Sequence, residues 1–315
     1  MMNIYPDNTF SIGNTPLVRL EKMADGMKAD IIAKIEGRNP AYSVKCRTAA
    51  SIVHEAEKNG TLKPGMTILE ATSGNTGIAL SMCGAARGYK VLLTMPESMS
   101  LERRKILKAL GAELILTPAA GSMGAAVKKT EELIADAPDK YFKADQFSNP
   151  ANPLVHFETT GPEIQEATDG SVDAVVCGVG TGGTVTGIGR YFRSIGADVT
   201  IAAVEPEESP LLSQHAAGKE LKPGPHGIQG IGANFIPENC DFSVIDRIES
   251  CSTDEALETS RRLSKEEGIL SGISSGAATA VALKLAAQEE FEGKRIVVIL
   301  PDSGERYLST KLFSA

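Results

Sequence analysis

The first candidate for chemistry is a lysine at the start of a predicted helix. Lys45 lies in the segment NPAYSVKCR, which follows the strand pattern DIIAKIE and opens a helix pattern. A lysine amine at such an apolar, hydroxyl-rich position loses solvation, which favours its neutral, nucleophilic form. Most lysines are solvated surface charges, so Lys45 alone does not establish a catalytic site. Arg47, two residues on, is either a surface helix charge or a second group that acts on this amine.

A glycine-rich turn supplies the second candidate. The segment GVGTGGT (178–184) directly follows an apolar strand pattern and directly precedes a helix pattern. Glycine lets backbone amides approach an anion closely, and a helix N-terminus adds a favourable dipole. Thr181 and Thr184 add hydroxyl donors. The segment therefore predicts a phosphate-binding loop, and the alternative is a tight strand-to-helix turn that needs positive φ.

The same turn also fits the dinucleotide fingerprint G-x-G-x-x-G, through Gly178, Gly180 and Gly183. Glu205 ends the next strand pattern and could bind a ribose, which would make the chain an NAD-dependent or flavin oxidoreductase. The fingerprint normally lies in the first βαβ unit of its domain, whereas a full α/β half precedes it here. We therefore keep this oxidoreductase as the less favoured alternative.

A second turn between a strand and a helix has the sequence TSGNTG (72–77). It contains no lysine or arginine, so backbone amides and hydroxyls would hold an anion there, which suits a small carboxylate. Asn75 adds a neutral amide donor. The turn could equally be a cluster of helix N-caps. A reactive amine, a phosphate loop and a carboxylate pocket together fit pyridoxal phosphate, whose aldehyde takes a lysine as a Schiff base.

The elements that must position these groups alternate along the chain. The strand patterns are residues 30–36, 67–71, 90–95, 113–117, 172–177, 199–205 and 295–300. Helix patterns lie at 76–88, 99–111 and 124–136 in the first half, and a segment with three prolines (148–163) interrupts the rhythm. Strands joined by single helices imply parallel sheets covered on both faces. We expect an α/β fold, a domain boundary at 148–153, and both glycine turns at the carboxyl ends of strands.

Composition excludes several classes of protein. The 315 residues are 42% hydrophobic and 23% charged, as in globular proteins, and 40 acidic against 32 basic residues give a net charge of -8. This charge disfavours nucleic acid and anionic membranes as partners. There is no apolar run long enough to span a bilayer and no signal-peptide pattern at the start. Five cysteines without a C-x-x-C pair and four scattered histidines predict reduced thiols, no metal site and a cytoplasmic protein.

Nine segments resemble the cysteine synthase A (O-acetylserine sulfhydrylase) family of fold-type II pyridoxal-phosphate enzymes. In order they are IGNTPLVRL, NPAYSVKCR, TSGNTGIAL, MPESMSLERRKILKALGAEL, QFSNPANP, GVGTGGTVTG, KPGPHGIQGIGANFIP, EEGILSGISSGAA and VVILPDSGERYLST. The resemblance implies two three-layer α/β domains with mostly parallel twisted sheets, like tryptophan synthase β, and an active site in the cleft between them. A smaller, mobile domain (35–149) would carry Lys45 and the TSGNTG loop, and a larger one (1–34 with 150–315) the phosphate loop.

The resemblance also implies roles for single residues. Lys45 would bind pyridoxal 5'-phosphate covalently, Asn75 would hydrogen-bond its ring hydroxyl, and Ser274 would face the pyridine nitrogen or simply cap a helix. The phosphate would be held by Gly180, Thr181, Gly182, Gly183 and Thr184. The substrate carboxylate would be bound by Thr72, Ser73, Thr76 and Gln146, with Gly230 in a loop at the mouth of the site.

The implied reaction is a β-replacement. Acetate leaves O-acetyl-L-serine, an α-aminoacrylate remains bound, and sulfide adds to give L-cysteine, with Lys45 removing and returning the Cα proton. Family alternatives are a cystathionine β-synthase-like enzyme and a thiosulfate-using sulfhydrylase, which typically has aspartate where this chain has Cys46. A binding protein that lost turnover is disfavoured, because Lys45 and Asn75 are retained. The family further implies a homodimer and a complex in which the C-terminal peptide of serine acetyltransferase enters the active site.

Overall fold

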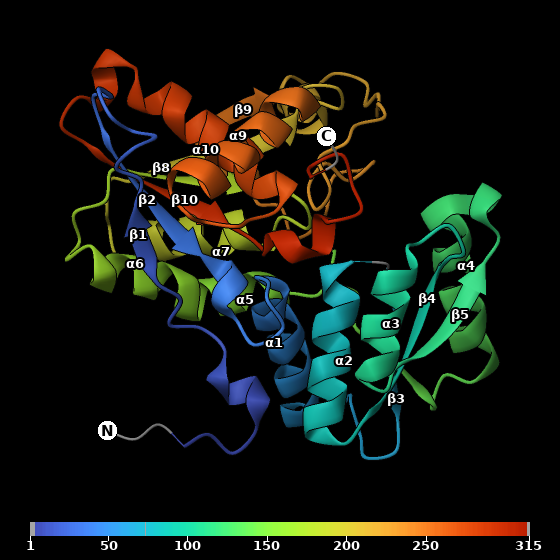
Figure 1. Ribbon diagram of the computed structural model, residues 1–315. Helices are drawn as coiled ribbons and strands as arrows, with labels where there is room; N and C mark the ends of the chain where they lie inside the picture. Colours follow the sequence, from blue (N-terminus) through green and yellow to red (C-terminus); the bar gives the residue numbers. More distant parts are fainter. Residues whose placement is uncertain (1–3, 73, 314–315) are drawn as a thin grey trace. The chain divides into compact units, whose positions relative to one another are not determined.

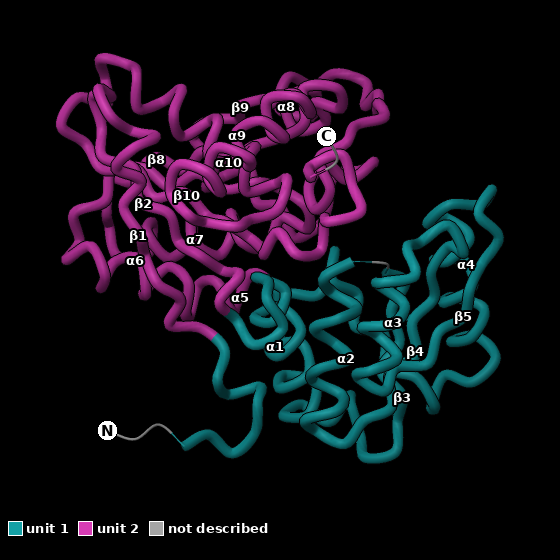
Figure 2. The backbone as a smooth tube through the Cα atoms, in the orientation of Figure 1, with its two compact units in different colours: residues 1–12, 39–152 teal, residues 13–38, 153–315 magenta. Residues whose placement is uncertain are grey.

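The chain folds into two compact units. The structure, a computed structural model, describes residues 4–72 and 74–313 (Figure 1). Unit 1 combines Met1–Ile12 with Asn39–Asn152, and unit 2 combines Gly13–Arg38 with Pro153–Ala315 (Figure 2). Each unit has its own sheet and its own buried core.

Unit 1 is built on a four-stranded parallel sheet of order β5-β4-β3-β6. Its elements are the 3₁₀ helix η1 (Asn8–Ser11), α1 (Lys45–Lys58), β3 (Thr67–Ala71), α2 (Asn75–Arg87), β4 (Lys90–Pro96), α3 (Leu101–Ala109), β5 (Glu113–Thr117), η3 (Ala119–Gly121), α4 (Ser122–Asp136) and β6 (Tyr141–Lys143). The helix α5 (Ala151–Val155) contains the point at which the chain passes into unit 2.

Helices cover both faces of this sheet. Alternate residues of a strand point to opposite faces, and the residues of β4 show what each face packs against. Val91, Leu93 and Met95 of β4 belong to a core cluster that also contains residues of α1, α2 and α3. Between them, the Thr94 hydroxyl donates to the carbonyl of Ala126 in α4 at 2.8 Å. Unit 1 is therefore a three-layer α/β structure.

Unit 2 contains a six-stranded sheet of order β1-β2-β10-β7-β8-β9, in which β1 pairs antiparallel with β2 and the other pairs are parallel. Its strands are β1 (Leu17–Arg19), β2 (Asp30–Ile35), β7 (Ala174–Gly178), β8 (Thr200–Pro206), β9 (Arg247–Cys251) and β10 (Arg295–Leu300). Its α-helices are α6 (Gly161–Ala167), α7 (Gly183–Ser194), α8 (Leu211–Ala216), α9 (Thr253–Glu266) and α10 (Ile273–Ala286). The shorter helices are η2 (Glu36–Arg38), the π-helical η4 (His156–Thr160), η5 (Phe242–Val244), η6 (Glu289–Phe291) and η7 (Gly304–Tyr307).

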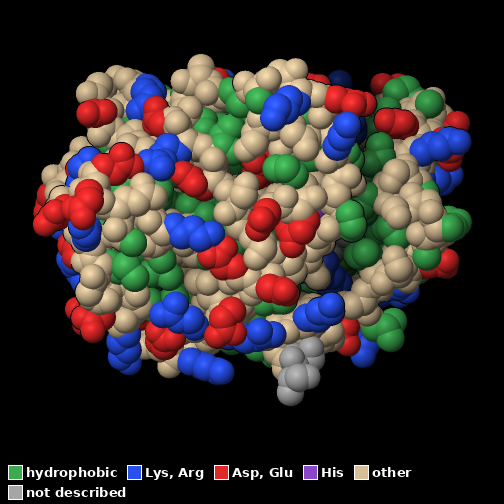
Figure 3. Space-filling model, turned by 90° about the horizontal axis from the view of Figure 1, so that it is seen from above, with side chains coloured by type: hydrophobic (Ala, Val, Ile, Leu, Met, Phe, Trp, Pro, Cys, Tyr) green, Lys and Arg blue, Asp and Glu red, His purple; other side chains and the backbone are tan. Residues whose placement is uncertain are grey.

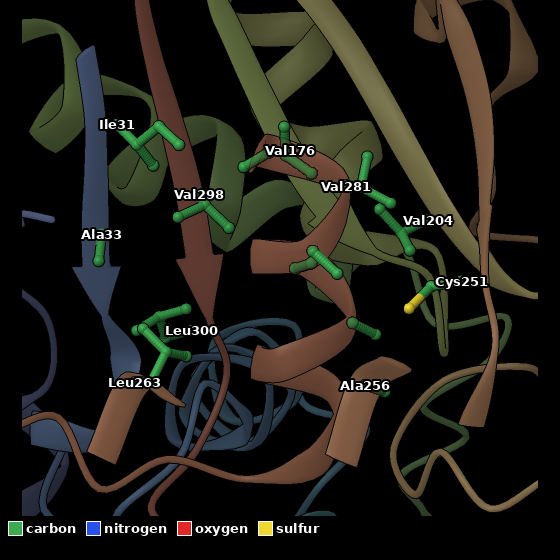
Figure 4. Packing of buried hydrophobic residues seen from close by; sticks show 14 of the residues in the cluster. Ile31, Ala33, Val176, Val204, Cys251, Ala256, Leu263, Val281, Val298 and Leu300 are labelled. Carbon is green, nitrogen blue, oxygen red and sulfur yellow. The ribbon is translucent and has the colours of Figure 1, made fainter. Parts of the chain in front are cut away.

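Two cores sandwich the central strands of unit 2. Val176 of β7 and Val298 of β10 lie in one cluster with Val281 of α10 (Figure 4). Val175 points to the opposite face, into a second cluster with Phe192 of α7. Each such buried side chain contributes roughly 1.5–3 kcal/mol. This packing fixes β7 in the middle of the sheet, with the 178–184 turn at its carboxyl end. The mixed α/β fold with parallel sheets confirms the predicted fold class.

Residues 4–12 group with unit 1, whereas the sequence analysis placed the whole of 1–34 in the domain of the phosphate loop, where residues 13–34 do lie. The ring of Phe10 stacks on that of His54 in α1, with 5.0 Å between centroids. Arg87 of α2 forms an ion pair with Asp7 at 2.9 Å. These contacts attach the segment around η1 to α1 and α2, and no local pattern reveals them because the partners lie far apart in sequence.

Acidic and basic side chains are interspersed on the face shown in Figure 3. Typical surface ion pairs in unit 2 join Arg247 to Glu249 at 3.0 Å and Lys284 to Glu255 at 2.7 Å. Exposed pairs of this kind contribute about 0–1 kcal/mol each, so the buried cores stabilise the fold. Among the described residues, no helix has the length and apolarity needed to cross a membrane.

Candidate active site

Lys45 is the first residue of α1 and follows a tightly folded loop. The N–H of Tyr42 donates to the carbonyl of Asn39 at 2.7 Å, and Tyr42 has a φ of +58°, in the left-handed region that non-glycine residues rarely adopt. Strained backbone of this kind clusters at functional sites. Arg47 is only 1% exposed, which excludes the surface-charge interpretation of that residue.

Two of the predicted carboxylate-binding residues contact each other. The hydroxyl of Thr76 donates to Oε1 of Gln146 at 2.5 Å, and both side chains are buried. Thr72 is also buried, and its hydroxyl oxygen accepts a hydrogen bond from the N–H of Gly74 at 3.3 Å. Ser73 lies outside the described residues. This end of β3 thus gathers neutral hydroxyl and amide groups.

Asn75 is the first residue of α2, which packs against α1. The N-cap of α2 is Gly74, so neither Thr72 nor Asn75 occupies the N-cap position. The first turn of a helix has N–H groups without intrahelical partners and a positive dipole end. The first turn of α2 is therefore suited to an anionic group, and Lys45 lies at the corresponding end of the neighbouring helix.

Glu70, which the sequence analysis did not single out, organises the loop that carries Gln146. Its buried carboxylate accepts the N–H of Asp145 at 2.8 Å and also the N–H of Gln146. Burial raises the pKa of Glu70 to about 7, although these N–H donors act in the opposite direction. A glutamate inside a strand pattern gives no signal of this role, since its partners lie some 75 residues away.

In unit 2, three predicted residues from distant segments come together. A Cβ added to Gly180 would collide with the backbone carbonyl of Gly230, and a Cβ on Gly230 would lie 3.4 Å from the hydroxyl of Ser274. Ser274 is the second residue of α10 and is 2% exposed, while the N-cap of that helix is Gly272. Ser274 is therefore not the ordinary N-cap that its sequence context also allowed.

The other residues of the predicted phosphate loop lie just before and at the start of α7. Gly182 is its N-cap, with a φ of +81°, and Gly183 is its first residue. A Cβ on Gly182 would come within 2.7 Å of the backbone of Cys240, so this position has neither the conformation nor the room for a side chain. Thr181 is buried, and the Thr184 hydroxyl lies 3.2 Å from Nε2 of His156.

His156 is a residue of this site that sequence reasoning missed. It is fully buried, and its Nδ1 lies 2.8 Å from the hydroxyl of Thr160. In the sequence it is one of four scattered histidines, and only the folded chain brings it to Thr184.

The structure assigns Glu205 a structural role instead of a ribose-binding one. Its carboxylate accepts the N–H groups of Leu212 (2.7 Å) and Ser213 (3.2 Å) at the start of α8, and the hydroxyl of Ser213. Burial raises the pKa of this carboxyl, and the side chain is 1% exposed. Both carboxylate oxygens are thus engaged by α8, so the dinucleotide interpretation of the 178–183 turn loses the acidic ligand on which it rested.

Comparison with known proteins decides the family. Residues 9–302 match the family described as "Pyridoxal-phosphate dependent enzyme". The chain belongs to this family. Pyridoxal phosphate is accordingly its cofactor, as the sequence analysis expected.

Relatives and solved structures agree with this family. The chain is 58% identical to "Cysteine synthase A" of Salmonella typhi, covering 100% of this chain and 97% of that one. It is 60% identical to "Cysteine synthase" of Haemophilus influenzae, over 99% and 98% of the two chains. The crystal structure of a cysteine synthase from Entamoeba histolytica superposes with a TM-score of 0.95 at 47% identity, covering 99% and 91%.

The residues of unit 2 fit the phosphate of this family's cofactor. The left-handed Gly182 caps α7, and the first-turn N–H groups of that helix have no intrahelical partner, while Gly180 brings the 228–232 segment close to the same turn. Such an arrangement binds phosphate without requiring a lysine or arginine. Thr184 adds a hydroxyl at the same place.

Proposed function

We propose that this chain is a cysteine synthase, which replaces the acetate of O-acetyl-L-serine with sulfide to give L-cysteine. The observation that carries the proposal is the 58–60% identity, over essentially the whole chain, to proteins named cysteine synthase. The geometry described above supports it, because the two units contain the lysine, hydroxyl and glycine groups that this reaction needs.

When bound, pyridoxal phosphate supplies an aldehyde for a lysine amine and a ring that withdraws electrons from the substrate Cα. The role of Lys45 is then to attach the cofactor and, once released by the substrate amine, to take and return the Cα proton at Nζ. Its place at the start of α1 supports this role. Asn75 would orient the cofactor through its side-chain amide.

The substrate carboxylate is bound, in this proposal, by the first turn of α2 and its neighbours Thr72, Ser73, Thr76 and Gln146. The hydroxyl hydrogen of Thr76 is used on Oε1 of Gln146, so Gln146 offers its amide N–H groups as donors and Thr76 holds that amide in place. The remaining donors are also uncharged, so they hold a carboxylate without a competing salt bridge. The bond between Thr76 and Gln146 fixes both side chains before substrate arrives, which reduces the entropy lost on binding.

Ser274 gives the site a neutral hydroxyl where a carboxylate would hold a proton on a neighbouring ring nitrogen. Its neighbour Gly230 belongs to the loop that we propose to line the mouth of the site. The absence of a fixed negative charge at position 274 suits β-elimination better than transamination.

A turnover assay tests the proposal. Purified protein is supplied with O-acetylserine or serine and with sulfide, thiosulfate or homocysteine, and we expect O-acetylserine with sulfide to be preferred. Lys45→Ala should abolish cysteine formation, whereas Lys58→Ala, at the exposed end of the same helix, should not. Hydride reduction followed by mass spectrometry should locate the cofactor on Lys45. Unchanged turnover in Lys45→Ala would refute the proposal.

The same family resemblance supports three further proposals. We infer that the chain forms a homodimer, that the C-terminal peptide of a serine acetyltransferase binds its active site, and that it acts in the cytoplasm. Light scattering tests the first, and competition between that peptide and O-acetylserine tests the second. All five cysteines are free thiols, which is compatible with a reducing compartment.

A further inference from the structure

His156 connects two threonine hydroxyls inside unit 2. Its Nδ1 lies 2.8 Å from Oγ1 of Thr160, and its Nε2 lies 3.2 Å from Oγ1 of Thr184. His156 and Thr160 are 0% exposed, so these bonds do not compete with bulk water. Thr184 is a residue of the proposed phosphate loop, whereas neither His156 nor Thr160 belongs to any predicted site.

The backbone around His156 is built for this contact. Residues His156–Thr160 form the π-helical segment η4, a rare conformation that occurs frequently at functional sites. The helix α7 packs against this segment at Gly187. A Cβ added to Gly187 would lie 2.5 Å from Cβ of His156 and would collide with the carbonyl of Pro153. The absence of a side chain at Gly187 lets α7 approach η4 closely enough for Thr184 to reach the imidazole.

The direction of these hydrogen bonds decides what Thr184 can offer. A neutral imidazole has one donor and one acceptor nitrogen. If Nδ1 accepts the Thr160 hydrogen, Nε2–H donates to Thr184, and the hydroxyl hydrogen of Thr184 stays available for an anion. In the other tautomer that hydrogen is used on Nε2, and Thr184 presents only lone pairs to a phosphate.

We propose that His156, set by Thr160, is a positioning residue that orients the Thr184 hydroxyl as a donor to the cofactor phosphate. This inference rests on the proposed function, because it needs a phosphate at residues 180–184. The order of donation is Thr160 to His156, His156 to Thr184, and Thr184 to a phosphate oxygen. Each bond in such a chain polarises the next.

Four variants of the holoenzyme test this order. His156→Gln places an amide N–H near the position of Nε2, whereas His156→Asn reaches only toward Thr160 and leaves Thr184 without its partner. Thr160→Val removes one hydroxyl from a buried side chain of the same shape. The control, Thr168→Val, removes a buried hydroxyl that donates to the Ile164 carbonyl, at 2.8 Å, at the C-cap of α6, the helix that follows η4.

The measurements are the rate of cofactor loss from the holoenzyme and the ³¹P resonance of the bound cofactor. We expect His156→Asn and Thr160→Val to lose cofactor about tenfold faster, the effect of one hydrogen bond to a charged group, with a shifted ³¹P resonance. His156→Gln should lose cofactor at a rate closer to that of the unmodified protein. Thr168→Val should have the same rate and the same ³¹P resonance as the unmodified protein. The ³¹P resonance separates a change at the phosphate from a loss of fold stability.

The outcomes distinguish this inference from the proposed function. If the unmodified protein takes up no pyridoxal phosphate, the proposed function itself fails. If it holds the cofactor, and Thr160→Val and His156→Asn retain it at the unmodified rate with an unshifted ³¹P resonance, the role of His156 is refuted and the proposed function stands. Equal effects of Thr160→Val and Thr168→Val would also refute it.

Discussion

Gly180 illustrates how one residue type can be required by a contact fifty positions away. A methyl group at Gly180 would meet the backbone carbonyl of Gly230, which cannot rotate aside. We expect Gly180→Ala to force the two loops apart, at a cost of about 1–3 kcal/mol, and to weaken cofactor binding about tenfold or more. Titration of the cofactor-free protein with pyridoxal phosphate measures this loss of affinity.

The neighbouring Gly178 provides a matched control. Its added methyl group would lie 2.9 Å from Cγ2 of Ile231, the end of a side chain that can adjust. Gly178→Ala should therefore retain much more of the cofactor affinity than Gly180→Ala. Equal affinities in the two variants would show that the approach of Gly180 to Gly230 does not shape the phosphate site.

The raised pKa of Glu70 should make the free energy of unfolding of unit 1 depend on pH. Burial raises its pKa from 4.5 to about 7, so the folded state binds this proton more tightly than the unfolded state. The stabilisation is complete below the unfolded pKa and is lost as the pH rises through about 7, a difference of about 3 kcal/mol. Glu70→Gln keeps a carbonyl acceptor for the N–H of Asp145 but does not titrate.

Urea unfolding of both proteins across this pH range tests the effect. The stability of Glu70→Gln relative to the unmodified protein should increase as the pH rises from 4.5 to 7. A difference between the two that stays constant with pH would contradict the pKa assigned to Glu70.

At the scale of elements, the sequence patterns that depend on local periodicity predicted the structure well. The strands expected at 67–71, 113–117 and 295–300 coincide with β3, β5 and β10. The three-residue β6 and the π-helical η4 were not predicted, because β6 is defined by its pairing with β3 and no sequence pattern distinguishes the π-helical turn of His156–Thr160. The site divides similarly: glycine turns are visible in the sequence, but the roles of His156 and Glu70 depend on long-range contacts.

The packing of α9 against α10 gives a prediction at this scale. Gly276 of α10 faces α9, where an added Cβ would collide with the carbonyl of Ala256 and lie 2.7 Å from the backbone nitrogen of Ser260. Because both obstacles are backbone atoms, Gly276→Ala should separate the helices and reduce the free energy of unfolding by about 1–3 kcal/mol. Denaturant titration measures the change.

Gly124 is the control, since it lies within α4 with open space around it. Gly124→Ala should be neutral or should stabilise the protein by up to about 1 kcal/mol, through the higher helix propensity of alanine. If Gly276→Ala behaved in the same way, the helices would not be in the close contact described.

For the molecule as a whole, the buried residues form separate clusters in the two units, one in unit 1 and two in unit 2. Cys46 and Cys83 lie in the core of unit 1, and Cys177, Cys240 and Cys251 lie in the two clusters of unit 2. The sequence predicted reduced thiols, and all five cysteines are free and buried in the structure. It could not foretell which core each occupies, because that depends on which strands and helices pack together.

Alkylation of these buried cysteines can report the order in which the two units unfold. Burial raises the pKa of the Cys240 thiol to about 11 and that of Cys251 to about 12, so the reactive thiolate is scarce and labelling requires opening of the structure. Unit 2 is larger and packs both faces of a six-stranded sheet, and larger domains bury a greater fraction of their surface. We expect Cys46 and Cys83 to be alkylated at lower denaturant concentration than Cys177 and Cys251, as measured by mass spectrometry after brief labelling. A single common midpoint for all five thiols would mean that the two cores unfold as one cooperative structure.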